Sequence, residues 1–368
     1  MANYAFETIT AAQAQLILVS DTLTIGDGAQ PVTSTSVTVI YESSGLIDIV
    51  VGARTVAFGA PLTAVSAQGG LIFSDGSQLY IGDGASNAFT GGAGTITAAF
   101  GGAGDDALSV SGAHDLLQGN AGSDTLTGAA GDDTIYGGQD NDQINSGGGI
   151  NFVNGNKGSD TITGAGAADT LLGGQGDDHV SGAGFLDGNL GDDLVSGSGQ
   201  LFGEAGADTL TSIGAGHDTL AGGDGDDSIV AGSGADSITG DDGNDTISIM
   251  GGPQVVAGGA GGDKFIFGTG TTSPGTVPQI IDWNGAEDKL SFLGYTPNPS
   301  DFTATSASDF ATAVTLANSL TTQNHFSFVG VQVGADFIIF AGGSGGVTSV
   351  VDLVGRSLAD FHTAQNLV

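Results

Sequence analysis

The most regular feature of this chain is an apolar residue that returns about every nine positions between residues 101 and 266, two places after an aspartate. Glycines lead up to each aspartate, as in Gly101–Ser109 and Gly119–Thr127, and polar residues flank the apolar one. Glycines favour tight turns, and one apolar side chain between polar neighbours is typical of a short strand with one buried face. The pattern therefore predicts a repeated turn and strand.

Two residues define each nine-residue unit. The sixth position is aspartate, at Asp106, Asp115, Asp124, Asp133, Asp142, Asp160, Asp169, Asp178, Asp193, Asp208, Asp218, Asp227, Asp236, Asp245 and Asp263. The eighth position is apolar, at Leu108, Leu117, Leu126, Ile135, Ile144, Ile162, Leu171, Val180, Val195, Leu210, Leu220, Ile229, Ile238, Ile247 and Phe265. Because the two positions keep the same separation throughout, a disordered Gly- and Asp-rich linker does not explain the pattern.

Two units make one coil of 18 residues, and stacked coils would pair their strands in parallel about 4.8 Å apart. This stacking places aspartates one above the other, as with Asp106 and Asp124. Carboxylates about 5 Å apart repel each other unless a cation lies between them. Calcium suits this position because it accepts about 6 to 8 oxygen ligands, including backbone carbonyls. The aspartates of the sixth position are therefore candidate calcium ligands.

The units resemble the RTX calcium-binding nonapeptide repeat, GGxGxDxUx, over residues 82–266. The resemblance implies an all-β fold in which a right-handed parallel β-roll binds several calcium ions at both turn edges. Carbonyl groups of the glycines that open the units are further candidate ligands, at Gly101, Gly119, Gly137, Gly155, Gly173, Gly222 and Gly240. Residues 280–290 resemble the segment that follows the roll in this family, which adds Asp282 and Asp288.

Several units depart from the repeat. Four turns lack the aspartate and have Asn87, Ile96, Asn151 and Gln254 at its position. We expect those turns to bind calcium weakly or not at all. Gly182–Asp187 and Gly197–Phe202 are six-residue units, which we expect to flatten one edge of the roll, so Asp187 is a doubtful ligand.

The flanking segments differ from the repeat and predict two caps. In residues 1–81, β-branched runs at 37–41, 47–51, 55–58 and 79–81 predict strands, and residues 9–19 predict a short helix. In residues 267–368, residues 306–320 predict an amphipathic helix, and residues 326–333 and 337–340 predict a hairpin. We expect both segments to cover ends of the roll, which would otherwise expose apolar side chains and strand edges.

The two ends of the sequence bear on secretion. Residues 350–361 resemble the last strand and tail of RTX proteins, whose uncleaved C-terminus is the type I secretion signal. Met1–Glu7 lacks a basic segment followed by an apolar run, so we expect no cleavable signal peptide. The resemblance therefore implies an extracellular protein of Gram-negative bacteria that is exported by type I secretion machinery.

The amino-acid composition limits the classes of partner that we expect for this chain. The 368 residues carry a net charge of −36, with 5 Lys and Arg against 41 acidic residues, of which 37 are Asp and 4 are Glu. So few basic residues exclude nucleic acid and an anionic membrane as expected partners. No run of about 18 apolar residues is present, so we expect no membrane insertion. The absence of cysteine excludes disulfides and thiolate metal sites.

Signals for catalysis are weak. No HExxH motif occurs, and the GxSxG string at 342–346 lies in a Gly-rich segment without a strand-to-helix turn, so we expect a flexible loop. The histidines are scattered, at His114, His179, His217, His325 and His362. The aspartates of the fifth position are expected to be exposed charges, at Asp105, Asp132, Asp177, Asp192 and Asp226. Trp283 is expected to pack in the core or in a cap.

These observations favour a non-enzymatic, calcium-dependent extracellular protein that folds outside the cell. Because a roll has two ends with unpaired strand edges, we expect self-assembly into a surface layer, filament or biofilm matrix. One alternative is a calcium-dependent adhesin or ligand-binding protein, with cell-surface polysaccharide as its partner. Another is a secreted enzyme, or a subunit of one, with an unrecognised site.

Overall fold

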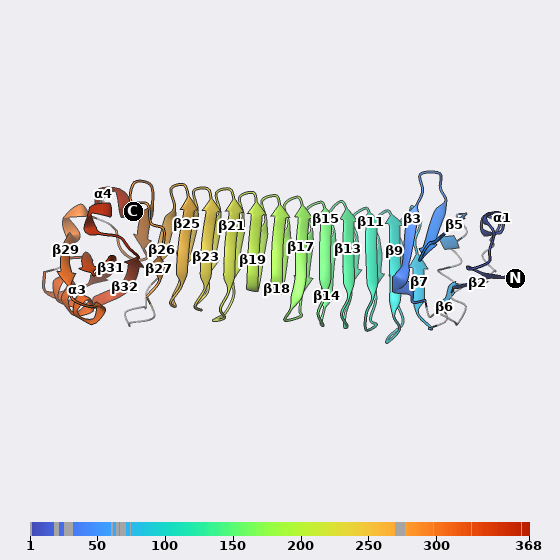
Figure 1. Cartoon of the computed structure of the whole chain (residues 1–368), viewed down its shortest axis with the longest axis horizontal. Coiled ribbons are helices and arrows are strands. Elements are labelled where there is room, and N and C mark those ends of the chain that lie inside the picture. The colour runs from blue at the N-terminus through green and yellow to red at the C-terminus, as the bar shows by residue number, and fades with distance from the viewer. Residues whose placement is uncertain are drawn as a thin grey trace. The chain divides into compact units, whose positions relative to one another are not determined.

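The computed structural model describes residues 2–17, 22–25, 32–59, 62–63, 66, 71–73, 75–268, 277–296, 298–324, 326–361 and 363–368. The chain divides into two compact units, Met1–Gly184 and Phe185–Val368. Strands dominate both units, and Figure 1 shows them stacked along each.

The first unit begins with a small β-rich module. A parallel sheet contains β1 (Asn3–Ala5), β2 (Thr22–Ile25) and β6 (Leu71–Phe73). An antiparallel sheet contains β3 (Val37–Tyr41), β4 (Ile47–Val51) and β5 (Arg54–Phe58). The strands predicted from the β-branched runs are thus confirmed. The helix predicted over residues 9–19 is shorter, α1 (Ala11–Ala14), with Thr10 as its N-cap.

Two parallel sheets form the roll of the first unit. One contains β7 (Gln78–Ile81), β9 (Thr97–Ala103), β11 (Leu116–Ala121), β13 (Thr134–Gln139), β15 (Phe152–Lys157) and β17 (Asp169–Gln175). The other contains β8 (Ala88–Thr90), β10 (Ala107–Ser109), β12 (Thr125–Thr127), β14 (Gln143–Gly147), β16 (Thr161–Gly164) and β18 (His179–Leu190). Leu117 pairs in register with Ile135, and Leu108 with Leu126, which confirms the coil of two nonapeptides.

The apolar residues of the eighth position form the core of the roll. Leu117, Ile135, Leu126 and Ile162 are fully buried, and their polar neighbours along each strand are not. Removing a Leu or Ile side chain from water contributes about 1.5–3 kcal/mol. Each strand of a coil therefore buries one apolar side chain, and these side chains together form the core of the roll.

The second unit repeats this arrangement. One sheet contains β19 (Leu194–Ala205), β21 (Thr219–Asp224), β23 (Ser237–Asp242), β25 (Val255–Ala260) and β27 (Gln279–Ile280). The other contains the start of β19 with β20 (Thr209–Ser212), β22 (Ser228–Ala231), β24 (Thr246–Ile249), β26 (Lys264–Phe267) and β28 (Lys289–Phe292).

The two six-residue units lie within long strands and form no turn of their own. β19 is 12 residues long and contains the six-residue unit Gly197–Phe202. Its first half pairs with β20 and its second half with β21. The strand therefore passes from one sheet to the other without a loop, as expected for a flattened edge. The other six-residue unit, Gly182–Asp187, lies inside the 12-residue strand β18.

The second unit ends in a mixed module. It contains β29 (Phe302–Ala307), α3 (Phe310–Asn324), β30 (Phe328–Val333), β31 (Asp336–Gly343), β32 (Gly346–Leu353) and α4 (Thr363–Asn366). The predicted hairpin is confirmed, with Val333 opposite Asp336. The predicted helix begins later than expected, because residues 306 and 307 belong to β29 and Asp309 accepts the N–H of Thr312 at 2.8 Å. None of the described helices combines the length and apolar character needed to cross a bilayer.

The last coil of the roll is covered by this module. β27 pairs with β32, and Leu290 of β28 forms a bridge with Leu367. The GxSxG string, expected to be a flexible loop, forms the tight turn between β31 and β32, where Gly343 pairs with Gly346. Trp283 is buried against Phe265 and Phe361, as predicted.

Candidate calcium sites

The aspartates of the sixth position form two kinds of row. In each unit, strands that run six or seven residues into a turn alternate with strands of three to five residues, the 12-residue strands apart. We call the sixth-position aspartates that follow β9, β11, β13 and β15 in the first unit, and β19, β21, β23 and β25 in the second, the long-strand rows. They are Asp106, Asp124, Asp142 and Asp160 in the first unit and Asp208, Asp227, Asp245 and Asp263 in the second. The short-strand rows contain Asp115, Asp133, Asn151 and Asp169 in the first unit and Asp218, Asp236 and Gln254 in the second.

A ladder of hydrogen bonds connects each long-strand row. The N–H of Asp106 donates to Oδ1 of Asp124 at 2.7 Å, and the N–H of Asp124 donates to Oδ1 of Asp142 at 2.8 Å. In the second unit the N–H of Asp227 donates to Oδ1 of Asp245 at 2.9 Å. One oxygen of each carboxylate is thus fixed by the neighbouring coil, which confirms that aspartates 18 residues apart lie one above the other.

The other oxygen of each carboxylate is buried and has no hydrogen-bond partner in the described part of the chain. This holds for Oδ2 of every member of both long-strand rows, namely Asp106, Asp124, Asp142, Asp160, Asp208, Asp227, Asp245 and Asp263. The side chains of Asp124 and Asp142 are each 1% exposed. A buried carboxylate oxygen without a partner is costly, so a group outside the described protein atoms is needed to satisfy it.

The glycine that opens each unit leaves room beside this oxygen. A Cβ on Gly119 would overlap Oδ2 of Asp124 and lie 2.6 Å from the carbonyl oxygen of Gly137. The carboxylate oxygen and the carbonyl oxygen of the next coil thus face the same small space. The same pair of oxygens flanks the predicted ligands Gly101, Gly137, Gly155, Gly222 and Gly240. For Gly173, its carbonyl oxygen lies at the corresponding point beside Gly155.

Burial shifts the protonation of these carboxylates. Desolvation, together with the nearby carboxylates of Asp160 and Asp124, raises the pKa of Asp142 to about 8, against the lowering effect of the Asp124 N–H. The pKa of Asp124 rises to about 7 through burial, despite the N–H of Asp106. Burial likewise raises the pKa of Asp208 and of Asp245 to about 7. Burial therefore disfavours the charged form of these carboxylates, and protonation or a neighbouring cation would relieve this cost.

These features fit a hard divalent cation. Each space offers a carboxylate oxygen and a backbone carbonyl oxygen, which are the donors that calcium prefers. No three acidic or histidine side chains converge on one point among the described residues, because each coil contributes one carboxylate to an edge. Backbone carbonyls are therefore the further ligands that such a cation would need.

The short-strand rows are also buried but are satisfied differently. Oδ2 of Asp115 accepts the N–H of Gly112 at 2.6 Å, and Oδ2 of Asp169 accepts the N–H of Gly166 at 3.1 Å. In the second unit, Oδ2 of Asp236 accepts the side-chain N–H of Gln254 at 3.3 Å. The nonapeptide pattern is the same at both edges and therefore predicts the same contacts for all its aspartates. The difference in the partners of Oδ2 depends on turn geometry that this pattern does not encode.

The other candidate ligands lie at the ends of the rows. The N–H of Asp160 donates to Oδ1 of buried Asp178, and the N–H of Asp193 donates to Oδ1 of Asp208, both at 2.7 Å. Asp288 is buried and accepts the N–H of Asp263 at 3.1 Å and of Asn284 at 2.6 Å.

Two candidates lie outside the regular turns. Asp282 accepts the N–H groups of Gly258 and Gly259 at 3.0 and 2.9 Å, one on each carboxylate oxygen. The doubtful ligand Asp187 lies within β18, where burial raises its pKa and nearby Glu204 raises it further.

The exposed aspartates of the fifth position have a role that the sequence analysis missed. Oδ1 of Asp105 accepts the N–H of Ser123 at 2.9 Å, and Oδ1 of Asp226 accepts the N–H of Asn244 at 2.7 Å. Each such carboxylate caps the turn of the following coil. Among the histidines, Nδ1 of exposed His114 lies 3.4 Å from the carbonyl oxygen of Asp132, and His325 and His362 lie outside the described residues.

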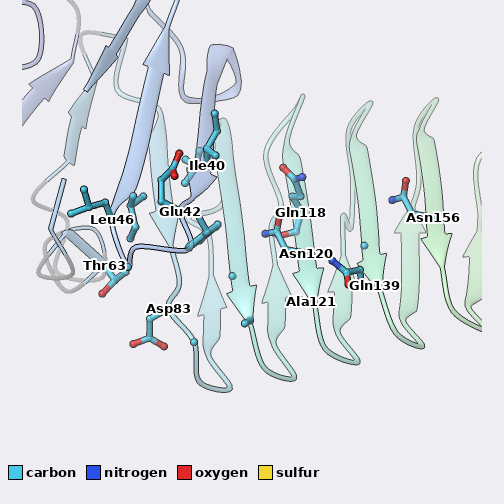
Figure 2. A pocket seen from close by; sticks show the side chains of 18 of the residues that line it. Ile40, Glu42, Leu46, Thr63, Asp83, Gln118, Asn120, Ala121, Gln139 and Asn156 are labelled. Carbon is cyan, nitrogen blue, oxygen red and sulfur yellow. The ribbon is translucent and has the colours of Figure 1, made fainter. Parts of the chain in front are cut away.

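A groove of about 920 Å³ lies in the first unit between the β3–β4 hairpin and the roll. The hairpin contributes apolar side chains, including Ile40 and Leu46, while the coils contribute the amides of Gln118, Asn120 and Asn156 (Figure 2). No pattern in the sequence indicates this groove, because it depends on how the hairpin folds over coils distant in the chain.

Comparison with known proteins identifies the repeats. The RTX calcium-binding nonapeptide repeat matches four times, at residues 109–144, 118–153, 145–180 and 212–247. The chain therefore carries RTX repeats, as the sequence indicated. Among curated proteins none matches the chain.

Two solved structures are similar to parts of the chain. One is the AlgE6R3 subunit of a mannuronan C5-epimerase from Azotobacter vinelandii, with 25% identity over 42% of this chain and 80% of that one and a TM-score of 0.30. The other is the extracellular lipase LipA from Serratia marcescens, with 17% identity over 80% of this chain and 40% of that one and a TM-score of 0.17.

Proposed function

We propose that this chain, which carries RTX calcium-binding repeats, is an extracellular protein whose roll folds when calcium binds between its coils. The observation that carries the proposal is the row of buried Oδ2 atoms without partners, each beside a carbonyl oxygen of the next coil, as at Asp124 and Gly137. Calcium supplies two positive charges and accepts about 6 to 8 oxygens at such a point.

The physical reason for coupling lies in the free energy of the metal-free roll. Its buried carboxylates repel one another, and ordering a Gly-rich backbone has a large entropic cost. With 68 glycines in the chain and one buried carboxylate per coil in each row, the free energy of calcium binding becomes folding free energy. Affinities of roughly 10⁻⁴–10⁻³ M, typical of extracellular modules, would keep the roll unfolded inside a cell and folded outside.

Circular dichroism of the full chain, with calcium raised from a calcium-stripped buffer to about 10 mM, tests this coupling. We expect a cooperative gain of strand signal with calcium and a much weaker response to magnesium, which requires a tighter octahedral shell. Strand content that is already complete without calcium would contradict the proposal.

Export by type I secretion is part of the proposal and rests on the resemblance of residues 350–361 to RTX tails. In a host with a type I exporter, the full chain should reach the medium while a chain lacking residues 346–368 should not. Equal export of both would show that the signal lies elsewhere.

We further propose a non-enzymatic structural role through self-assembly of the folded chain. Support comes from exposed apolar side chains on both terminal modules, Leu16 and Ile40 on one and Leu358 on the other. Because β32 covers the last coil, assembly would use the modules rather than bare strand edges. Light scattering and electron microscopy in calcium should reveal ordered polymers, and a compact monomer at all concentrations would contradict this role.

A second candidate function is ligand binding at the groove between the β3–β4 hairpin and the coils. Its lining combines the apolar side chains of Ile40 and Leu46 with amides such as those of Asn120 and Asn156, a combination that suits the apolar faces and hydroxyls of a neutral saccharide. Binding of neutral polysaccharides to the calcium-loaded chain, with Asn156→Ala as the groove variant, tests this candidate. Binding that is absent, or unaffected by the variant, would remove it.

A further inference from the structure

The two edges of the roll are built differently in each unit. Along the long-strand rows, pairing continues through the start of the turn, with Asn120 opposite Gly138 and Ala121 opposite Gln139. The strands before the short-strand rows pair only up to the turn, as β12 does with β14 over Thr125–Thr127. Strand pairing therefore extends further into the turns of the long-strand rows than into those of the short-strand rows, whose turns are connected instead by single backbone hydrogen bonds such as that from the N–H of Gly131 to the carbonyl oxygen of Gly148.

The oxygen atoms of the two kinds of row also differ in their partners. All members of the long-strand rows, such as Asp124 and Asp227, keep a buried Oδ2 without a hydrogen-bond partner among the described atoms. On the short-strand rows, the buried side-chain oxygens without a partner among the described atoms are Oδ2 of Asp133 and the neutral Oε1 of Gln254. The residue that follows Asp133 in its row is the neutral Asn151. A cation at that point would therefore meet one carboxylate charge instead of two.

In the first unit, backbone and amide N–H groups satisfy the remaining carboxylates of the short-strand row. Gly112 and Gly166 donate their N–H groups to Oδ2 of Asp115 and Asp169 at 2.6 and 3.1 Å. Nδ2 of Asn151 donates to Oδ1 of Asp169 at 3.1 Å. Hydrogen-bond donors from the chain thus take the place that a cation would fill.

In the second unit, the side-chain amide of Gln254 occupies the position that a cation would fill. Its Nε2 donates to the carbonyl oxygens of Gly232 and Gly251 at 2.7 and 2.6 Å and to Oδ2 of Asp236 at 3.3 Å. These three oxygens come from two successive coils and surround one nitrogen, and the Gln254 side chain is fully buried. Two carbonyls and a carboxylate from neighbouring turns are the donors expected of a calcium site, with an amide nitrogen at its centre.

We infer that calcium binds along the long-strand rows only, and that the short-strand rows are held together without metal by amide and backbone N–H donors. The inference rests on the proposed calcium-dependent folding and departs from the expectation of calcium at both edges. Each unit of the roll then has one edge that responds to calcium and one whose contacts are independent of it.

Two matched double variants in the second unit test this assignment in the full chain. Asp227→Asn with Asp245→Asn changes the long-strand row, and Asp218→Asn with Asp236→Asn changes the short-strand row. Both remove two charges and keep an Oδ1 acceptor for the ladder, as Asn151 already does for the N–H of Asp133. The readouts are the number of calcium ions bound, by equilibrium dialysis, and the calcium midpoint of folding, by circular dichroism.

We expect the long-strand variant to bind fewer ions and to raise the midpoint about tenfold or more, and the short-strand variant to match the unaltered chain within about twofold. Equal loss of calcium in both variants would overturn the inference while leaving calcium-dependent folding intact. No calcium binding by the unaltered chain would instead refute the proposed function.

A gain-of-site variant keeps the test decisive if a double variant fails to fold. Gln254→Asp removes the amide nitrogen and offers a second carboxylate opposite Asp236. We expect this variant to bind one more calcium ion than the unaltered chain. An unchanged number of ions would show that the amide does not stand in for calcium, and would contradict the inference.

Discussion

The N–H of Asp124 donates to Oδ1 of Asp142, 2.8 Å away in the next coil, while Oδ2 of Asp142 is buried without a hydrogen-bond partner among the described residues. One oxygen therefore fixes the stacking of the coils and the other is available to a cation. The same aspartate thus serves the backbone ladder and the proposed metal site, which makes the two functions separable by substitution.

Asp142→Asn should weaken calcium-dependent folding without breaking the ladder. The amide oxygen can still accept the N–H of Asp124, but the charge that would bind the cation is lost. We expect the calcium midpoint of folding to rise roughly tenfold, equivalent to about 1.4 kcal/mol. Asp105→Asn is the matched control, because Asp105 is exposed and needs only its acceptor for the N–H of Ser123. A midpoint that shifts equally in both variants would argue against Asp142 as a ligand.

Gly119→Ala should block one candidate site from the backbone side. The added Cβ would overlap Oδ2 of Asp124 and crowd the carbonyl oxygen of Gly137. We expect a loss of about 1–3 kcal/mol in the stability of the calcium-loaded chain, measured by urea unfolding. Gly148→Ala is the control in the same unit, since a Cβ there meets nothing within 4 Å. Equal stability of the two variants would contradict the proposed geometry.

Acid should partly replace calcium. The pKa of Asp142 is about 8 and that of Asp124 about 7 in the folded chain, against about 3.9 in an unfolded one. The folded state thus binds more protons between these values, so the stability of the calcium-free roll falls as pH rises from about 4 to about 8. In calcium-stripped buffer we expect more strand signal at pH 5 than at pH 8, together with a higher calcium midpoint at pH 5 because protons compete. Strand content that increases with pH in the absence of calcium would contradict this prediction.

Trp283 should report the folding of the second unit. It is the only tryptophan, is 1% exposed, and its ring centroid lies 6.2 Å from that of Phe265, the core residue of β26. Calcium should therefore shift its fluorescence to shorter wavelength at the same midpoint as the strand signal. Emission that stays at the wavelength of solvated tryptophan in saturating calcium would show that this end of the roll does not order with the metal.

The parts of the structure that follow the nonapeptide period could be predicted from the sequence. Leu117 and Asp124 occupy fixed places in the unit, so their burial and stacking follow from period alone. Features that depend on contacts between distant segments could not be predicted. The helix α3 begins later than its apolar pattern suggested, because residues 306 and 307 pair with β30 instead.

The contacts within the short-strand rows could not be predicted from the sequence either. The nonapeptide pattern predicts weak or absent calcium binding at Gln254, but it cannot show that the Nε2 of this residue lies among three oxygens from two coils. Likewise, the hydrogen bond from Gly112 to Asp115 depends on the local turn, which differs from that of the long-strand rows although the aspartate occupies the same position.

The most direct test of calcium-coupled folding is the size of the purified chain by small-angle X-ray scattering in calcium-stripped buffer and in about 10 mM calcium at neutral pH. The account predicts an expanded chain without calcium, with a radius of gyration near that of an unfolded polymer, and an ordered particle with calcium. An ordered particle of the same dimensions in both buffers would contradict it.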